Sequence, residues 1–261
     1  MNPIGKSILS HEQDAMTRYH QFTRGAFYGV VAALPLLLAY EMLLLASGWE
    51  VRMPIRNAGD VWLRFFLASL DVDPSRATPV MILALLLAMP VVKRMEERLE
   101  IRYLGMLLLE ALLYSLLLGV VIQLILWGLA ALFAQVEMTR LGLWTPALAV
   151  PLPGGALQGL ALSLGAGLFE EFLFRVVLLW VLTRLTRLVL APWLASAVAI
   201  TLAAVLFSSA HYTGPYRDPF QLASFLYRFF AGLLFTALYH WRGFAVTAYA
   251  HAFYDIRVII F

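Results

Sequence analysis

The sequence predicts an all-α integral membrane protein, a polytopic bundle of seven or eight transmembrane helices. Composition is the first indication: 62% of the 261 residues are hydrophobic and the mean hydropathy is +0.82. Only 13% of the residues are charged, about half of the roughly 25% found in soluble domains. The apolar stretches fill nearly the whole length, so we expect residues 1–261 to form a single integral membrane domain.

Charge and cysteine content exclude several classes of function. The net charge is +3, and the basic residues lie mostly in short connections, as the positive-inside rule requires. No basic stripe is present, so we expect a lipid bilayer as a partner and no nucleic acid. The absence of cysteine excludes disulfides, thiolate metal sites and cysteine nucleophiles. The first residues also lack the short apolar core of a removable signal peptide.

The first segments combine a polar N-terminus with one clear span. Residues 1–23 are polar and of mixed charge, which predicts a tail or an interfacial helix. The first span is predicted at about 25–46; it contains Pro35, which membrane helices tolerate.

A short apolar segment follows a polar connection at 48–60. Residues 61–70 are apolar but contain Arg64, and the segment is too short to span, because about 20 residues are needed. We therefore predict an interfacial or re-entrant helix here, which would become an eighth span if it crossed.

The next span, at 79–92, ends at a charged run, 93–98. The run makes this the most basic connection of the chain, so we expect it to be cytoplasmic. It contains one of the two Glu-Glu pairs, which a solvated membrane-flanking surface explains better than catalysis.

The remaining spans are predicted at 104–133, 157–182, 192–211, 220–239 and 244–261. Proline-rich or turn-rich connections are predicted at 134–155, 212–219 and 240–243. Seven spans place the N-terminus in the cytoplasm and the C-terminus outside. In the fourth of these seven spans, Gly159, Ser163 and Gly167 form a row of small residues that allows close approach of a neighbouring helix.

The same span carries three charges in its apolar middle: Glu170, Glu171 and Arg175. Each charge within a bilayer costs roughly 2.5–3.5 kcal/mol on insertion scales. On a helix, Glu171 and Arg175 share a face, with the acid N-terminal to the base. An ion cluster that locks two helices together explains this pair but leaves Glu170 without a partner, and the alternative is that Glu170 is used for chemistry.

Two later spans also carry ionisable groups at helical spacing. Phe207 and His211 are four residues apart, as are His251 and Asp255. A single histidine on an apolar helix is usually structural. Two of them, on separate spans and in the same half of the chain as an unpaired glutamate, favour a functional site within the bundle.

Activation of a water molecule needs this set of groups. A carboxylate in a low-dielectric site is a stronger base than in water and can act near neutral pH. One histidine can hold the same water or shuttle its proton, and a second can stabilise an oxyanion. A serine nucleophile is less favoured, because Ser208 could reach His211 but no third group orients that histidine.

The ordered motifs Glu-Glu-x-x-x-Arg, Phe-x-x-x-His and His-x-x-x-Asp resemble those of the CPBP family of intramembrane glutamic endopeptidases. This family includes the CAAX-processing proteases and the bacteriocin-processing Abi proteins, and the resemblance covers about residues 160–261. It implies that Glu170 activates water with the help of His211. It further implies that His251 and Asp255 form the oxyanion side, and that Glu171 and Arg175 support the site.

Asp255 departs from the pattern, which often has Asn at this position. An ionised Asp cannot donate a hydrogen bond to an oxyanion. It must therefore be protonated, orient His251, or help to bind a metal.

Two other functions remain as alternatives to an endopeptidase. Five side chains could ligate zinc in a metal-dependent hydrolase, although the His-Glu-x-x-His motif is absent. They are Glu170, Glu171, His211, His251 and Asp255. A transporter with an ion-coupled carboxylate, or an immunity protein, would need no chemistry. We expect no cofactor and no metal, a membrane-associated peptide or protein as the substrate, and a location in the inner membrane of a bacterial cell. The substrate could be a prenylated C-terminus, a bacterial peptide or a C-terminal anchor.

Overall fold

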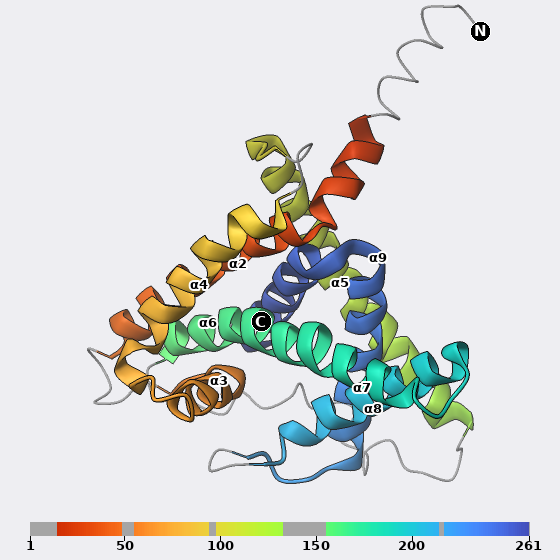
Figure 1. The fold of residues 1–261 in the computed structure, drawn as a ribbon. Coiled ribbons are helices and arrows are strands. Elements are labelled where there is room, and N and C mark those ends of the chain that lie inside the picture. Colours follow the sequence, from red (N-terminus) through yellow and green to blue (C-terminus); the bar gives the residue numbers. More distant parts are fainter. Residues whose placement is uncertain (1–14, 49–54, 94–97, 133–154, 214–216, 261) are drawn as a thin grey trace, which may run out of the picture.

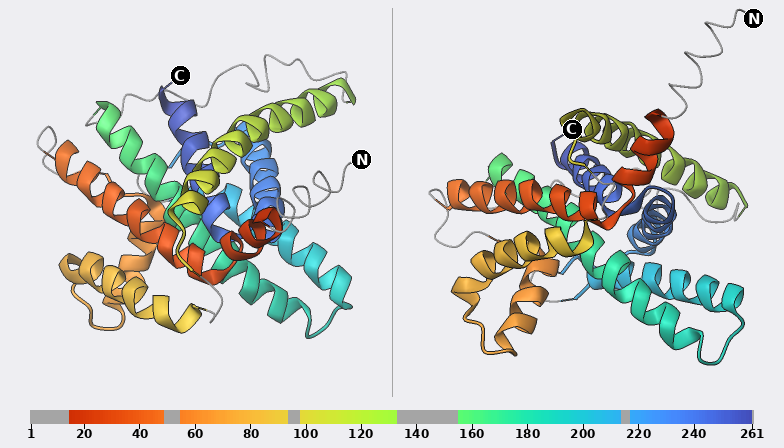
Figure 2. Two further views of the ribbon diagram at one scale, coloured as in Figure 1. Left: turned by 90° about the horizontal axis from the view of Figure 1, so that it is seen from above. Right: turned by 45° about the horizontal axis from the view of Figure 1, so that its top comes forward.

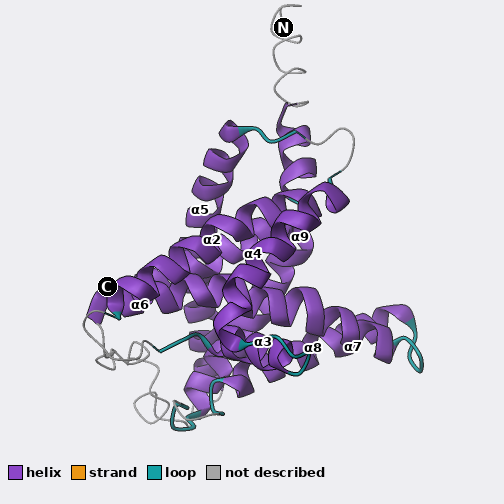
Figure 3. Ribbon diagram, turned by 60° about the vertical axis from the view of Figure 1, so that its left-hand side comes forward, coloured by secondary structure: helices purple, strands orange, loops and turns teal. Residues whose placement is uncertain are grey.

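The computed structural model describes residues 15–48, 55–93, 98–132, 155–213 and 217–260. Within these ranges the protein is helical and contains no strand (Figure 3). The all-α prediction is therefore confirmed for the part of the chain that is described. The predicted connection at 134–155 and most of the charged run at 93–98 lie outside it.

The helices are the following, in chain order. Residues 15–23 are helical, and then come α2 (Ala26–Ser47), α3 (Ala58–Ala68), the 3-10 turn η1 (Pro74–Arg76), α4 (Ala77–Val92), α5 (Ile101–Leu132), α6 (Gly155–Gly165), the π-helical segments η2 (Ala166–Glu170) and η3 (Phe172–Leu178), α7 (Leu179–Thr186), α8 (Pro192–Ala210) and α9 (Leu222–Ile260).

Five helical segments of the described chain are long and apolar enough to cross a membrane. They are Ala26–Ser47, Pro74–Val92, Ile101–Leu129, Pro192–Ala210 and Leu222–Val258. They account for six of the seven predicted spans, because the last segment contains two of them. With only 11 residues, α3 is shorter than a span needs to be.

Two predicted features of the helices take a different form in the structure. The turn predicted at 240–243, between the spans at 220–239 and 244–261, is a kink at Gly243 inside α9, with φ 77° and ψ −178°. A Cβ there would lie 2.5 Å from the carbonyl oxygen of Arg24, so a glycine is required both by the backbone and by the close contact. The stretch around the Glu pair is π-helical and not an ordinary α-helix.

The stretch from α6 to α7 runs across the middle of the molecule (Figure 1). It packs against α2 and α9, while α9 also contacts α5 and α8. In both views of Figure 2, α7 and α8 extend side by side away from the other helices. One apolar cluster joins α5 to α9, and a second joins α2, α4 and α6 to the C-terminal half of α9. The stretch that carries the Glu pair therefore packs between α2, from the N-terminal half of the chain, and α9, from the C-terminal half.

At Gly167, the last of the predicted row of small residues, a neighbouring helix does approach closely. A Cβ on Gly167 would lie 2.3 Å from the carbonyl oxygen of Ala248 and 2.8 Å from the Cβ of Ala252. Those distances are below van der Waals contact, so only a glycine permits α9 to approach η2 this closely.

A second buried ion pair joins α9 to α5, away from the Glu pair. Arg242 is fully buried and binds the carboxylate of Glu110 on α5 through two nitrogens. Its Nη2 also donates to the hydroxyl of Thr23 at 3.0 Å, and Tyr19 donates to the same carboxylate. The helix at 15–23 is thereby tied to α5 and α9.

Candidate active site

The two adjacent glutamates lie where the helix changes its winding. η2 ends at Glu170, η3 begins at Phe172, and Glu171 joins the two segments. π-helical turns inside a helix are rare and are frequent at functional sites. Here they set the directions of two neighbouring carboxylates, one half-buried at Glu170 and one fully buried at Glu171.

Glu171 is held from two sides. Its Oε1 lies 3.0 Å from Nη1 of Arg175 and accepts a hydrogen bond of 2.6 Å from Nδ1 of His251. The guanidinium of Arg175 lies 4.4 Å above the ring of Phe207 and 5.7 Å from that of Phe235. The predicted ion pair is present, and it is buried in an aromatic setting that suits a planar cation.

His251 is fixed by three contacts. Besides the bond to Glu171, its ring stacks on Phe235 with 4.5 Å between centroids and 22° between planes. Its Nε2 lies 3.7 Å from Oδ2 of Asp255, one turn further along α9. This distance is longer than a hydrogen bond, so the two groups face each other as predicted, while the tighter partner of His251 is Glu171.

His211 caps the C-terminal end of α8. Its Nδ1 lies 3.0 Å from the carbonyl oxygen of Phe207. A carbonyl oxygen can only accept, so Nδ1 carries the proton and Nε2 of the neutral ring is an acceptor. The Phe-x-x-x-His spacing therefore fixes the tautomer of the histidine as well as its face on the helix.

Glu170 lies among these groups. It interacts electrostatically with His211, His251 and Arg175, and Asp255 interacts electrostatically with His251 and with both glutamates. The structure thus brings together the six residues that the sequence singles out, from three separate stretches of the chain. They are Glu170, Glu171, Arg175, His211, His251 and Asp255.

One further residue reaches the site and was missed by the sequence analysis. Nδ2 of Asn57 donates a hydrogen bond of 2.8 Å to Oε1 of Glu170, across 113 residues of sequence. The only local signal was that of a helix cap, an Asn four residues before the start of the segment 61–70. The prediction treated it as part of a polar connection.

The arrangement of donor atoms was also compared with that of metal sites. Within the described ranges, no group of three or more His, Asp or Glu side chains is arranged to hold a metal ion. The geometry therefore gives no support to the zinc alternative.

Residues 152–257 match the family model described as "Type II CAAX prenyl endopeptidase Rce1-like". The matched range contains all six residues that the sequence singles out. Comparisons with curated proteins and with solved structures gave no match. The family match confirms the CPBP resemblance: residues 152–257 match the Rce1-like domain, whose family is the type II CAAX prenyl endopeptidases, a group of membrane proteases.

Proposed function

We propose that the protein is a glutamate-dependent intramembrane endopeptidase that cleaves a peptide bond near the C-terminus of a membrane-associated protein or peptide. The observation that carries this proposal is that the two adjacent glutamates make different contacts. Oε1 of Glu171 contacts both Arg175 and His251, whereas Glu170 lies next to His211 and His251 and, among the described residues, is hydrogen-bonded only by Asn57, at one of its oxygens. A carboxylate in this setting suits a general base.

In the proposed reaction, Glu170 removes a proton from a water molecule whose second hydrogen is bonded to Nε2 of His211. The hydroxide attacks the scissile carbonyl carbon, and the tetrahedral intermediate carries the charge on its oxygen. Glu170 then passes its proton to the leaving nitrogen as the C–N bond breaks. No covalent intermediate with the protein is formed.

His251 is assigned to the oxyanion side. Its Nδ1–H is engaged by Glu171, which leaves Nε2 as the atom that can donate to the oxyanion when the ring is doubly protonated. Asp255 faces this nitrogen at 3.7 Å. Of the three roles open to Asp255, the orientation of His251 agrees best with this contact.

We further propose seven crossings in the inner membrane of a bacterial cell. The five apolar segments provide six of them when α9 is divided at Gly243. The helical stretch from α6 to α7 provides the seventh, with the Glu pair at its middle. Polar backbone that departs from regular α-helix is tolerated at such depth where it is buried in protein.

The proposal is tested with the full-length protein in liposomes. The probe is a quenched fluorescent peptide that ends in a farnesylated Cys-aliphatic-aliphatic-X sequence, and a second peptide lacks the farnesyl group. Glu170→Ala and His211→Ala should abolish cleavage while the protein still accumulates in the membrane. Glu100→Ala is the matched control, because Glu100 pairs only with the exposed side chain of Arg102 among its described ion pairs.

A second arm identifies the substrate class in cells. Membrane proteomes are compared between a deletion strain carrying the wild-type gene and one carrying Glu170→Ala, and the uncleaved substrate should accumulate in the latter. Full cleavage by Glu170→Ala would overturn the assignment of the base. Loss of activity with a chelator, restored by zinc, would favour the metal-dependent alternative instead.

A further inference from the structure

The side chain of Asn57 makes two hydrogen bonds, and they fix which way its amide points. Oδ1 accepts a bond of 2.8 Å from the backbone N–H of Gly59 and so caps α3. Since an N–H can only donate, the capping atom must be the oxygen. Nδ2 then faces Glu170 and donates to Oε1 at 2.8 Å. The helix cap thus forces a donor toward the carboxylate.

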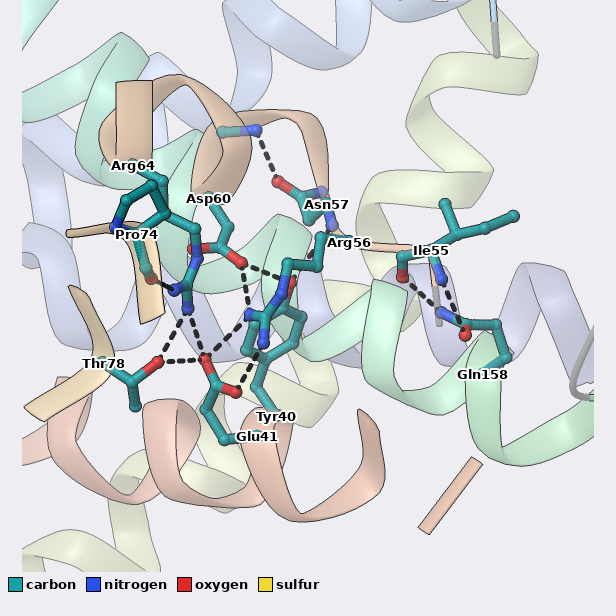
Figure 4. A network of polar contacts seen from close by, with 11 residues as sticks. Tyr40, Glu41, Ile55, Arg56, Asn57, Asp60, Arg64, Pro74, Thr78 and Gln158 are labelled. Atoms are coloured by element: carbon teal, nitrogen blue, oxygen red, sulfur yellow. Dashed lines mark hydrogen bonds and ion pairs between the residues drawn. The ribbon is translucent and has the colours of Figure 1, made fainter. Parts of the chain in front are cut away.

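The backbone of Asn57 is itself held in place. Its N–H donates to the hydroxyl of Tyr40 at 3.1 Å, and that hydroxyl donates to Oδ2 of Asp60 at 2.9 Å. Arg56 and Arg64 each pair with both Asp60 and Glu41 of α2 (Figure 4). Asp60 is fully buried, so this network fastens the start of α3 to α2 through several charge-assisted bonds.

Two glycines permit the close approach of this helix start to the Glu-bearing helix. A Cβ on Gly59 would lie 2.9 Å from the Cβ of Phe169, the residue before Glu170. A Cβ on Gly165 would lie 2.7 Å from the ring of Tyr40 and 2.9 Å from the Cβ of Asn57. The absence of side chains at Gly59 and Gly165 therefore lets Asn57 come within hydrogen-bond distance of Glu170.

We propose that Asn57 is a positioning residue for Glu170, so that the active site is completed by a residue outside the Rce1-like range 152–257. This inference rests on the proposed function of Glu170 as the base. The amide holds one carboxylate oxygen and favours the charged form of the group. The other oxygen is thereby directed at the water. The titratable or charged groups that interact with Glu170 are Arg175 on its own helix, His211 at the end of α8, and His251 and Asp255 on α9.

The contact itself is tested without any substrate, by thermal unfolding of the full-length protein in detergent. Asn57→Asp keeps a good helix cap but sets two carboxylates against each other. We expect this substitution to lower the Tm by about 2–4 °C. In the double variant with Glu170→Gln the amide and carboxylate exchange places, and the hydrogen bond returns. The Tm should recover most of the loss, and strictly additive shifts would overturn the contact.

The positioning role is tested by kinetics on the farnesylated fluorescent peptide. Asn57→Ser keeps a capping oxygen, but its hydroxyl is too short to reach Glu170. We expect kcat to fall at least tenfold with little change in KM. The acidic limb of the pH–rate profile should move to higher pH, because the charged carboxylate has lost a donor. Asp73→Ala is the matched control: it removes the cap that Asp73 provides to Ser75, and kcat and the pH profile should stay unchanged.

The outcomes separate the two proposals. If Glu170→Gln still cleaves the peptide, the proposed function fails, while the Tm measurements still decide whether the contact exists. If Glu170→Gln is inactive but Asn57→Ser has the kcat and pH profile of the wild type, only the positioning role fails.

Discussion

Glu171 accepts a hydrogen bond of 2.6 Å from Nδ1 of His251, two residues that are 80 positions apart in the sequence. The same oxygen lies 3.0 Å from Arg175. This shared contact joins the Glu-bearing helix to α9 inside the protein, where both residues are buried. It supports the proposal that two adjacent glutamates have different tasks: Glu171, whose Oε1 contacts both Arg175 and His251, supports the site, and Glu170 is left for chemistry.

Removal of Glu171, which contacts both Arg175 and His251, should cost stability as well as activity. In Glu171→Ala, Arg175 would remain buried without its partner, and loss of one member of a buried ion pair costs about 3–5 kcal/mol. We expect a lower Tm and reduced accumulation in the membrane. Glu170→Ala is the control, because it should lose activity with a much smaller change in Tm. Equal Tm values for the two variants would contradict this division.

A second prediction concerns the ion pair between Arg242 and Glu110, next to the break in α9 at Gly243. Arg242→Ala should destabilise the protein by about 3–5 kcal/mol, because Glu110 would lose a buried partner. Arg102→Ala, which breaks the exposed pair with Glu100, should leave thermal unfolding unchanged. The comparison fails if both variants unfold at the same temperature.

A third prediction uses two glycines in helices. Gly167→Ala would place a methyl group 2.3 Å from the carbonyl oxygen of Ala248, so the helix that carries the Glu pair would have to move away from α9. We expect loss of both stability and cleavage. Gly105→Ala meets nothing within 4 Å and should be neutral or stabilise by about 0.5–1 kcal/mol. Cleavage rates and Tm check both, and a harmless Gly167→Ala would contradict the close approach.

A fourth prediction concerns the position at which this chain departs from the family pattern. Asp255→Asn should retain most of the cleavage, because an amide oxygen can still face Nε2 of His251 and the amide nitrogen can donate to an oxyanion. Asp255→Ala should lose at least tenfold in kcat, since the polar group that faces Nε2 of His251 is then absent. Initial rates on the farnesylated peptide distinguish these outcomes. Loss of activity in the Asn variant equal to that in the Ala variant would show that the charge of Asp255 is required.

The sequence by itself determined the features that depend on local spacing and on hydropathy. Apolar length predicted six spans that lie in the five segments able to cross a membrane. The four-residue spacing of Glu171 and Arg175 predicted their ion pair, and the order of three motifs indicated the family that the match at 152–257 confirms. The ion pair could be predicted because helical periodicity brings residues three or four positions apart onto one face. The spans and the motif order could be predicted because both can be read directly along the chain.

Only the tertiary structure decided the contacts between distant segments. The sequence assigned Glu171 to Arg175 alone, and it gave Asn57 no partner in the C-terminal half. His251 contacts Glu171 because α9 packs against the Glu-bearing helix. Asn57 contacts Glu170 because α3 packs against the same helix. The π-helical winding around the Glu pair was likewise not predicted. Such contacts follow from how whole helices fit together, and helical periodicity carries no information about which faces will meet.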